Sequence, residues 1–358
     1  MPADADSLPD DIEALKALLR QRDGELQQLR DTVSTLEQAL SVRALEFEQL
    51  HLQLAKLKRM QFGRKSAKLD RPIERGVAGP GLLAHILVSK FADHQPLYWQ
   101  SVIYARDGVA LDRSTMARWV ASCGALLDPL VQALRQYVLA PGKVHGDDKP
   151  VQVLAPGNGK TRTGRFWVYV RDDRHAGSAA PPAVWFAYAA TRQGRHPQSH
   201  LSEFSGVLQA DAYAGYNDVY ADGRIREAAC MAHARRKIHD VHVGGATATT
   251  SEALRRIGEL YAIEAQIRGH LPDRRHEVRQ QQARQLLDSL HAWLQERLLT
   301  LSRHSDTAKA INYMLNHWQA LAYYCEDGRV EIDNNIAENA LRGVSLGRKN
   351  FLFLAVLC

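Results

Sequence analysis

The fold of this 358-residue chain is decided by the stretch Val144-His-Gly-Asp-Asp-Lys-Pro-Val-Gln-Val-Leu154 and by the apolar segments after it. Gly164–Arg171 and Ala183–Tyr188 are rich in aromatic and β-branched residues and lie between Gly and Pro turns, so we expect three consecutive strands. Val207–Asp211 is expected to be a fourth strand, after a short helical stretch near residues 198–204. Strands first and strand–helix alternation afterwards predict an α/β domain with helices on both faces of a sheet.

Acidic residues mark this stretch and a second one far along the chain. Asp147 lies inside the first expected strand, and Asp211 ends the fourth. The block Glu331-Ile-Asp-Asn-Asn-Ile-Ala-Glu-Asn-Ala-Leu-Arg342 adds a late carboxylate at Glu338. Two separated aspartates and a late glutamate are what a two-metal phosphoryl-transfer site on DNA requires, since carboxylates can hold a pair of divalent ions. Asp148 should point away from Asp147, because neighbours on a strand alternate.

Basic residues accompany the late acid. Three of them are expected to steady scissile or flanking phosphates by charge-assisted hydrogen bonds: Arg342, Arg348 and Lys349. The Asp-Asn-Asn run at 333–335 is expected to cap the helix that carries Glu338. A second basic group follows Cys230-Met-Ala-His233 and is expected to contact a phosphate backbone: Arg235, Arg236 and Lys237. Cys230 and His233 share a helical face and could bind a metal, but they are only two ligands.

Four separate motifs carry a family resemblance. They are Asp147 in its strand, Gln209–Tyr216, Cys230–Lys237 and Glu331–Asn350. Together they resemble the insertion sequence 66 family of bacterial transposases, with few gaps from about Arg71 to Phe353. Because several independent motifs occur in the right order, the resemblance is far more specific than a single glycine pattern would be.

The resemblance implies a fold, an activity and a site. The family belongs to the DDE class, whose catalytic core is RNase H-like, with the first and fourth strands adjacent. Its catalytic and metal-binding triad falls on Asp147, Asp211 and Glu338 of this chain. It implies two Mg²⁺ ions, with Mn²⁺ able to substitute, for strand cleavage and then strand transfer. The implied partners are double-stranded DNA of the element ends and the target, with element-encoded accessory proteins as further candidates.

The chain also departs from this family. Relatives usually carry a cysteine-rich, zinc-binding module before the segment that starts near Arg71, and a further helical region after Asn350. Neither is found here, so we expect no zinc site, and an alternative stays open: a catalytically inactive remnant that dimerises and binds element ends. A stand-alone RNase H-like nuclease or resolvase shares the fold, but the predicted coiled coil and helical insertion disfavour it.

The first 60 residues are expected to form a coiled coil. Between residues 12 and 57, twelve of fourteen positions at alternating three- and four-residue spacing are apolar, which is typical of a self-associating helix. Arg22 and Arg43 interrupt this seam and could set its register. The alternative is an amphipathic helix that packs on its own domain.

A basic linker is expected at residues 61–80. Residues 56–75 carry eight bases and two acids, whereas residues 1–50 carry eleven acids and five bases. A short basic run after an acidic helix suggests contact with a polyanion, and Arg64 and Lys65 are expected to bind DNA. A solvated linker explains the charges equally well.

Residues 81–140 are expected to be all-helical. A helix, a turn at Asp107-Gly108 and a second helix opened by Asp112 outline a helix-turn-helix. Three side chains of the second helix would then face DNA: Arg113, Ser114 and Arg118. The alternative is a plain three-helix support with Trp119 in its core.

Residues 141–358 are expected to form the catalytic domain, with a helical insertion at about 245–327 where apolar residues keep helical spacing. Four scattered cysteines without a C-x-x-C pair argue against a disulfide scaffold. The acidic N-terminus is unlike a signal peptide, and no apolar run approaches the ~18 residues that span a bilayer. We therefore expect a cytoplasmic, nucleoid-associated bacterial protein that uses no membrane.

Removing residues 1–55 is expected to leave a folded, mostly monomeric protein that binds one DNA end but cannot pair two. The reason is that the apolar seam that would be buried between two chains is gone. Sedimentation at micromolar concentration checks this, and a truncated chain that still dimerises would contradict this division of labour.

Overall fold

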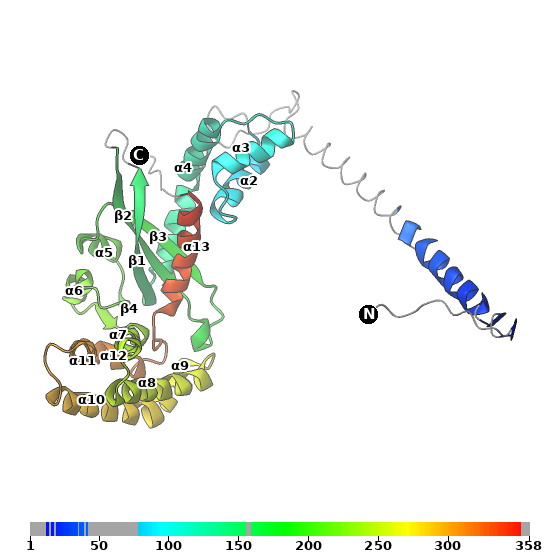
Figure 1. Ribbon diagram of the computed structural model, residues 1–358. Coiled ribbons are helices and arrows are strands. Elements are labelled where there is room, and N and C mark those ends of the chain that lie inside the picture. The colour runs from blue at the N-terminus through cyan, green and yellow to red at the C-terminus, as the bar shows by residue number, and fades with distance from the viewer. Residues whose placement is uncertain are drawn as a thin grey trace. The chain divides into compact units, whose positions relative to one another are not determined.

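The computed structural model describes residues 78–154 and 159–351, together with helical residues 12–13, 16–17, 19–34, 36–38 and 41. The chain divides into two compact units, Met1–Leu82 and Leu83–Cys358. The second unit is a mixed α/β assembly in which helices flank a sheet (Figure 1).

The described residues between 12 and 41 of the first unit are helical, and their large apolar side chains are exposed in the single chain. Six of them occupy positions of the expected seam: Ile12, Leu19, Leu26, Leu29, Val33 and Leu36. The seam beyond residue 41, and Arg64 and Lys65, lie outside the described residues. Self-association therefore stays a prediction.

Five strands form one sheet. They are β1 (Gly142–Leu154), β2 (Thr161–Arg171), β3 (Ala183–Ala189), β4 (Gly206–Gln209) and β5 (Ile225–Ala228). Their order is β3-β2-β1-β4-β5. β2 is antiparallel to β1 and to β3, whereas β4 is parallel to β1 and to β5. The predicted α/β class and the mixed sheet are confirmed.

Strand alternation divides the sheet into two packed faces. Trp167 and Tyr169 of β2 are buried in a core with Phe204, on the face covered by α5 (Arg195–His200), α6 (Asn217–Tyr220) and the end of α4 (Arg113–Val138). Val168 and Val170, between and beyond them, pack against α13 (Asn335–Phe351) on the other face. Each odd or even position of β2 thus has a fixed side, because successive side chains on a strand point to opposite faces.

The segment before the sheet consists of α2 (Pro80–Phe91), α3 (Leu97–Arg106) and α4. The expected second helix of a helix-turn-helix is the start of α4, which is one helix of 26 residues. Arg113, Ser114 and Arg118 are exposed on it, and the Arg113 guanidinium lies 5.6 Å from the centre of the Tyr98 ring. Met116, rather than the half-buried Trp119, is fully buried there. DNA contact by α4 stays a prediction.

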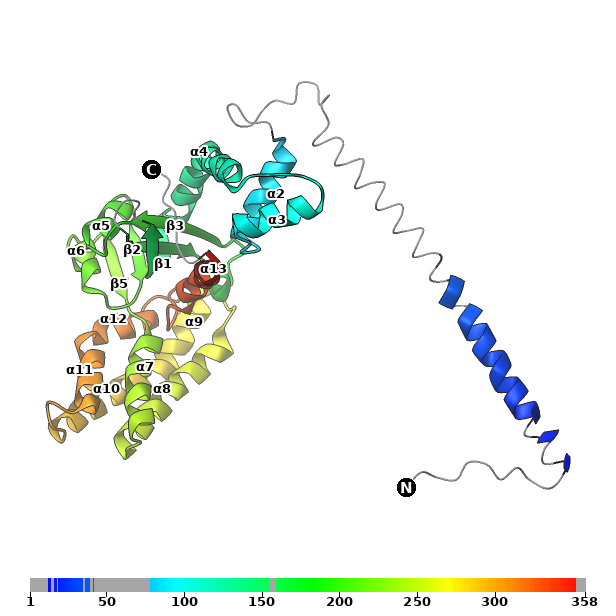
Figure 2. The same cartoon turned by 45° about the horizontal axis from the view of Figure 1, so that its top comes forward.

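The expected insertion consists of helices joined by short turns. It contains α8 (Ala248–Ile267), α9 (Pro272–Val278), α10 (Arg284–Leu299), α11 (Asp306–Asn316) and α12 (Trp318–Ala322). A π-helical turn, Arg279–Ala283, joins α9 to α10 without a break. In Figures 1 and 2 the helices α8–α11 gather at one end of the sheet. None of the helices among the described residues is long and apolar enough to span a membrane.

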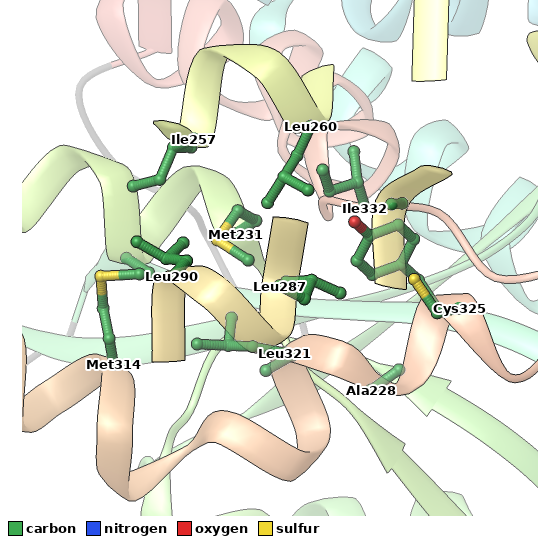
Figure 3. Packing of buried hydrophobic residues seen from close by; sticks show 14 of the residues in the cluster. Ala228, Met231, Ile257, Leu260, Leu287, Leu290, Met314, Leu321, Cys325 and Ile332 are labelled. Atoms are coloured by element: carbon green, nitrogen blue, oxygen red, sulfur yellow. The ribbon is translucent and has the colours of Figure 1, made fainter. Parts of the chain in front are cut away.

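An apolar core joins the insertion to the sheet. Figure 3 shows side chains of α7 (Met231–Gly244) and of the insertion pointing toward one another: Met231, Ile257, Leu260, Leu287, Leu290, Met314 and Leu321. Val207 of β4 and Ala228 of β5 belong to the same core. The insertion is thus packed against the β4–β5 edge.

A buried ionic network ties the same parts together. The Arg275 guanidinium donates to both carboxylate oxygens of Glu331 at 3.0 Å, and Arg279 donates to both oxygens of Glu264 at 2.8 and 2.7 Å. Lys143 Nζ of β1 lies 3.8 Å from Glu331 Oε1. Burial opposes ionisation, yet bonds and charges from His175, Lys143 and Arg275 hold the pKa of Glu331 well below its ordinary value.

Arg275→Ala is expected to lower the free energy of unfolding by about 3–5 kcal/mol, because it leaves the Glu331 carboxylate buried without its main partner. Arg274→Ala is the matched control: Arg274 is the exposed neighbour, with a surface pair to Glu277, and should cost less than about 1 kcal/mol. Urea unfolding of both variants checks this, and equal losses would contradict the assignment.

Candidate active site

Asp147 and Asp148 lie next to each other on β1 and have opposite surroundings. A side chain at the preceding Gly146 would meet Leu208 Cδ1 at 3.0 Å, in the core beneath the sheet. By alternation Asp148 shares that face and Asp147 faces α13. The Asp148 carboxylate is 1% exposed and accepts from Arg165 at 2.8 Å and from Arg192 at 2.9 Å. Asp148 is therefore a structural ion-pair partner, and Asp147 is free to act on the other face.

Asp211 follows the strand next to β1. His145 of β1 is in register with Gln209 of β4, so the residues two positions further along these parallel strands are Asp147 and Asp211. The Arg192 guanidinium lies 3.6 Å from Asp211 Oδ2 and 3.9 Å from the centre of the Tyr213 ring. Arg192 thus contacts both Asp148, beneath the sheet, and Asp211, just after β4. No sequence motif revealed this role.

Glu338 belongs to the first turn of α13. Ala337 and Leu341, on either side of it along the helix, are buried against β2, and this packing fixes the direction of the glutamate. Glu338 and Asp147 line one cavity of about 600 Å³. The other walls of this cavity include Lys149, His233, Arg236, Asn339 and Arg342.

The loop before α13 is held to the sheet by amide hydrogen bonds. Gln209 accepts from the Glu331 backbone N–H at 3.1 Å and donates to the Glu331 carbonyl. Asn334 Nδ2 donates to the Gly146 carbonyl at 2.8 Å, and Asn334 Oδ1 lies 2.9 Å from His145 Nδ1. Burial lowers the pKa of His145 to about 3, so this imidazole is neutral.

The expectation that residues 333–335 cap α13 needs correction. Asp333 accepts from the Asn335 backbone N–H at 3.1 Å, but the Asn334 side chain turns away from the helix and bonds to β1. The reason is that Asn334 is fully buried beside β1. The pairing of β1 with β4 ends at His145, and the next carbonyl, that of Gly146, bonds to Asn334 instead. Asn334 positions the helix by anchoring its start.

The acids of the site are crowded. The pKa of Asp147 is raised to about 7, mainly by burial; the hydrogen bond from the Asp148 N–H lowers it, and the carboxyls of Asp211, Asp148 and Glu338 contribute to the rise. Burial also raises the pKa of Asp211, against the charge of Arg192. In this site the buried Asp211 Oδ1 and Glu338 Oε1 accept no hydrogen bond from the described residues, and His233 Nδ1 lies 3.6 Å from Glu338 Oε1. Unsatisfied acceptors among crowded carboxyls favour a cation.

Cys230 and His233 meet a third residue that the sequence did not bring to them. Their ligand atoms and a Glu338 carboxylate oxygen all lie within 4.8 Å of one another. However, Cys230 Sγ already accepts from the Asn334 N–H at 3.1 Å, and burial raises its thiol pKa to about 12. Cys230 therefore serves the loop before α13, and His233 remains beside the acids.

The expected basic residues divide into separate groups. Arg236 lies 3.5 Å from Glu338 Oε2 and Arg342 lines the same cavity, whereas Arg235 lies outside it. Lys237 turns to α11, with its ammonium 4.6 Å from the centre of the Tyr313 ring. These three neighbours on α7 point in different directions, because one residue turns the helix by about 100°, and all three are exposed; their contact with a phosphate backbone stays a prediction. The side chains of Arg348 and Lys349 lie outside the described residues.

Comparison with known proteins agrees with the motifs. Residues 75–356 match the family described as Transposase IS66 family. The protein y4hP of Sinorhizobium fredii is 39% identical over 295 residues, which cover 78% of this chain and 53% of that protein. The protein y4qI of the same organism is 38% identical over 288 residues, with the same shares. The chain spans about half the length of these curated relatives. The resemblance is thereby confirmed, and the chain belongs to the IS66 transposase family.

Proposed function

We propose that this protein is a DDE-class DNA transposase that cleaves DNA strands and transfers the freed 3′ ends to target DNA. One observation carries the proposal: Asp147, Asp211 and Glu338 come from distant parts of the chain and lie close together beside the central strand β1, where buried oxygens of Asp211 and Glu338 accept no hydrogen bond from the described residues. The strand order, with β2 antiparallel and β4 parallel to β1, supports an RNase H-like core.

The three acids fit a pair of Mg²⁺ ions. Mg²⁺ prefers hard oxygen ligands, and Asp211 Oδ1 and Glu338 Oε1 are such oxygens that accept no hydrogen bond from the described residues. A cation would also relieve the repulsion that raises the pKa of Asp147. When bound, the ions would stabilise the attacking and the leaving oxygen of the phosphate, and Mn²⁺ accepts the same ligands.

The chain's own residues bind and orient the DNA. Arg342 and Arg236 line the cavity and would hold phosphate oxygens by charge-assisted hydrogen bonds. Arg192, stacked on Tyr213, keeps the Asp211 carboxylate in place. The substrates would be double-stranded DNA of the element ends and the target. The N-terminal helix would bring two copies together, with element-encoded proteins as further partners.

Replacing Asp147, Asp211 or Glu338 by the amide is expected to reduce Mg²⁺-dependent nicking of element-end DNA by more than ~100-fold. This loss exceeds the effect typical of outer-shell residues, because each amide removes a charged ligand. DNA binding should change little. Glu203→Gln, at an exposed glutamate, is the control and should cut normally.

Retained nicking in Asp211→Asn would overturn the triad. Binding by the unaltered chain without nicking in Mg²⁺ or Mn²⁺ would instead favour the alternative, an inactive remnant that occupies element ends.

Asp147→Asn is expected to stabilise the metal-free protein at neutral pH. The folded-state pKa of Asp147, about 7, lies above the ordinary value, so its protonated form stabilises the fold at low pH. That stability is lost as pH rises through about 4 to 7. The variant should therefore gain about 2 kcal/mol above pH 7, after a discount for partial solvent access, and nothing below pH 4. Urea unfolding in a chelator checks both limits, and equal stability at pH 8 would contradict the shift.

A further inference from the structure

A second cavity of about 560 Å³ adjoins the candidate active site. It lies between α7 and α8 and is lined by Arg235, Arg236, His239, Gly258, Tyr261 and Asn335. Arg236 and Asn335 line both cavities. An extended polymer that enters the first cavity can therefore continue into the second along α7.

The second cavity is electropositive. Its walls carry the two cations Arg235 and Arg236, and no carboxylate lines it. His239, also in the wall, lies 4.0 Å from Asp240 Oδ1 and is not counted as a cation. Arg236 is shared with Glu338 at 3.5 Å, whereas Arg235 is exposed and forms no ion pair with any residue in the described ranges. A concave surface lined by one sign of charge attracts the opposite charge.

Gly258 leaves room in this cavity. It lies in the interior of α8, where glycine weakens a helix relative to alanine. Packing does not require it, because a Cβ at this position would meet no atom within 4 Å. Its exposed backbone faces the basic side chains across the cavity, which suits close approach by a ligand.

We propose that this second cavity binds a backbone phosphate of the DNA strand whose scissile bond lies in the first cavity. The inference rests on the proposed function and adds to it a path for the strand, across α7 and toward the insertion helix α8. Phosphate contacts of this kind position DNA without reading its sequence. The bound phosphate lies a few nucleotides from the scissile one, because the two cavities share a wall.

Filling the cavity tests the proposal. Affinity for element-end DNA is measured by fluorescence anisotropy in a chelator, so that no cutting occurs. Gly258→Glu is expected to weaken binding by at least ~10-fold, because it adds bulk and negative charge where a phosphate binds. Gly258→Ala should bind within about two-fold of the unaltered chain. Gly24→Glu is the matched control, since Gly24 is also an exposed helical glycine with no atom near its Cβ position, and it is not among the residues expected to bind DNA.

Removing the cation gives a second, independent measurement. Arg235→Ala is expected to weaken binding several-fold and to reduce the salt dependence, the slope of log K against log salt, by about one. Arg303→Ala, at another exposed arginine, should leave the slope unchanged. Replacing single phosphates of the DNA by a neutral methylphosphonate should weaken binding at one position near the cut. In the Arg235→Ala variant the same replacement should cause no further loss of affinity, because the contact is already absent.

The outcomes separate this inference from the proposed function. Two results would overturn the cavity assignment even if Asp211→Asn abolishes cutting. One is that Gly258→Glu binds DNA like the unaltered chain. The other is that the loss of affinity from Arg235→Ala adds to the loss from every methylphosphonate position. Loss of binding with Gly258→Glu, in a protein that unfolds at the same temperature, supports it even if the unaltered chain never cuts.

Discussion

The buried carboxylate of Glu331 is the contact on which the rest of this structure depends. Both oxygens of this carboxylate accept hydrogen bonds from Arg275 of the insertion, and one of them lies near Lys143 of β1. The backbone of Glu331 bonds to Gln209 of β4. A buried charge is costly unless all its partners are present, so the insertion, the sheet and the loop before α13 must assemble together. Asn334, three residues later, then bonds to β1, and Glu338 follows in the next turn.

Strand alternation gives two adjacent acids opposite tasks. Asp148 is enclosed by arginines beneath the sheet, whereas Asp147 faces other carboxyls with little compensation. The first arrangement stabilises the fold, and the second stores repulsion that a cation would release. Arg192 contacts both Asp148 and Asp211, so the cation that pairs with Asp148 also reduces the repulsion between Asp211 and Asp147.

Much of this could be predicted from sequence because it depends on local patterns. The aromatic and β-branched runs identified β1 to β3, and the acids stood out within or just after expected strands. The ionic network could not be predicted, because Arg275 and Glu331 are 56 residues apart and Gln209 and Glu331 are 122 apart. The direction of Lys237 could not be predicted either, because charge alone does not give a side chain's direction on a helix, and its contact with Tyr313 is with a residue 76 positions away.

The π-helical turn at Arg279–Ala283 lets one continuous helix make ionic contacts at one end and apolar contacts along the rest. Such a turn accommodates an extra residue within a helix, and each residue changes the angular phase by about 100°. α10 presents Leu287 and Leu290 to the apolar core, while α9 presents Arg275 to Glu331 and Val278 to the same core. Insertions or deletions in this helix are thus constrained by phase as well as by length: a single residue lost from the π-helical turn would rotate Arg275 and Val278 relative to Leu287 and Leu290, so the helix could not keep both its ionic and its apolar contacts.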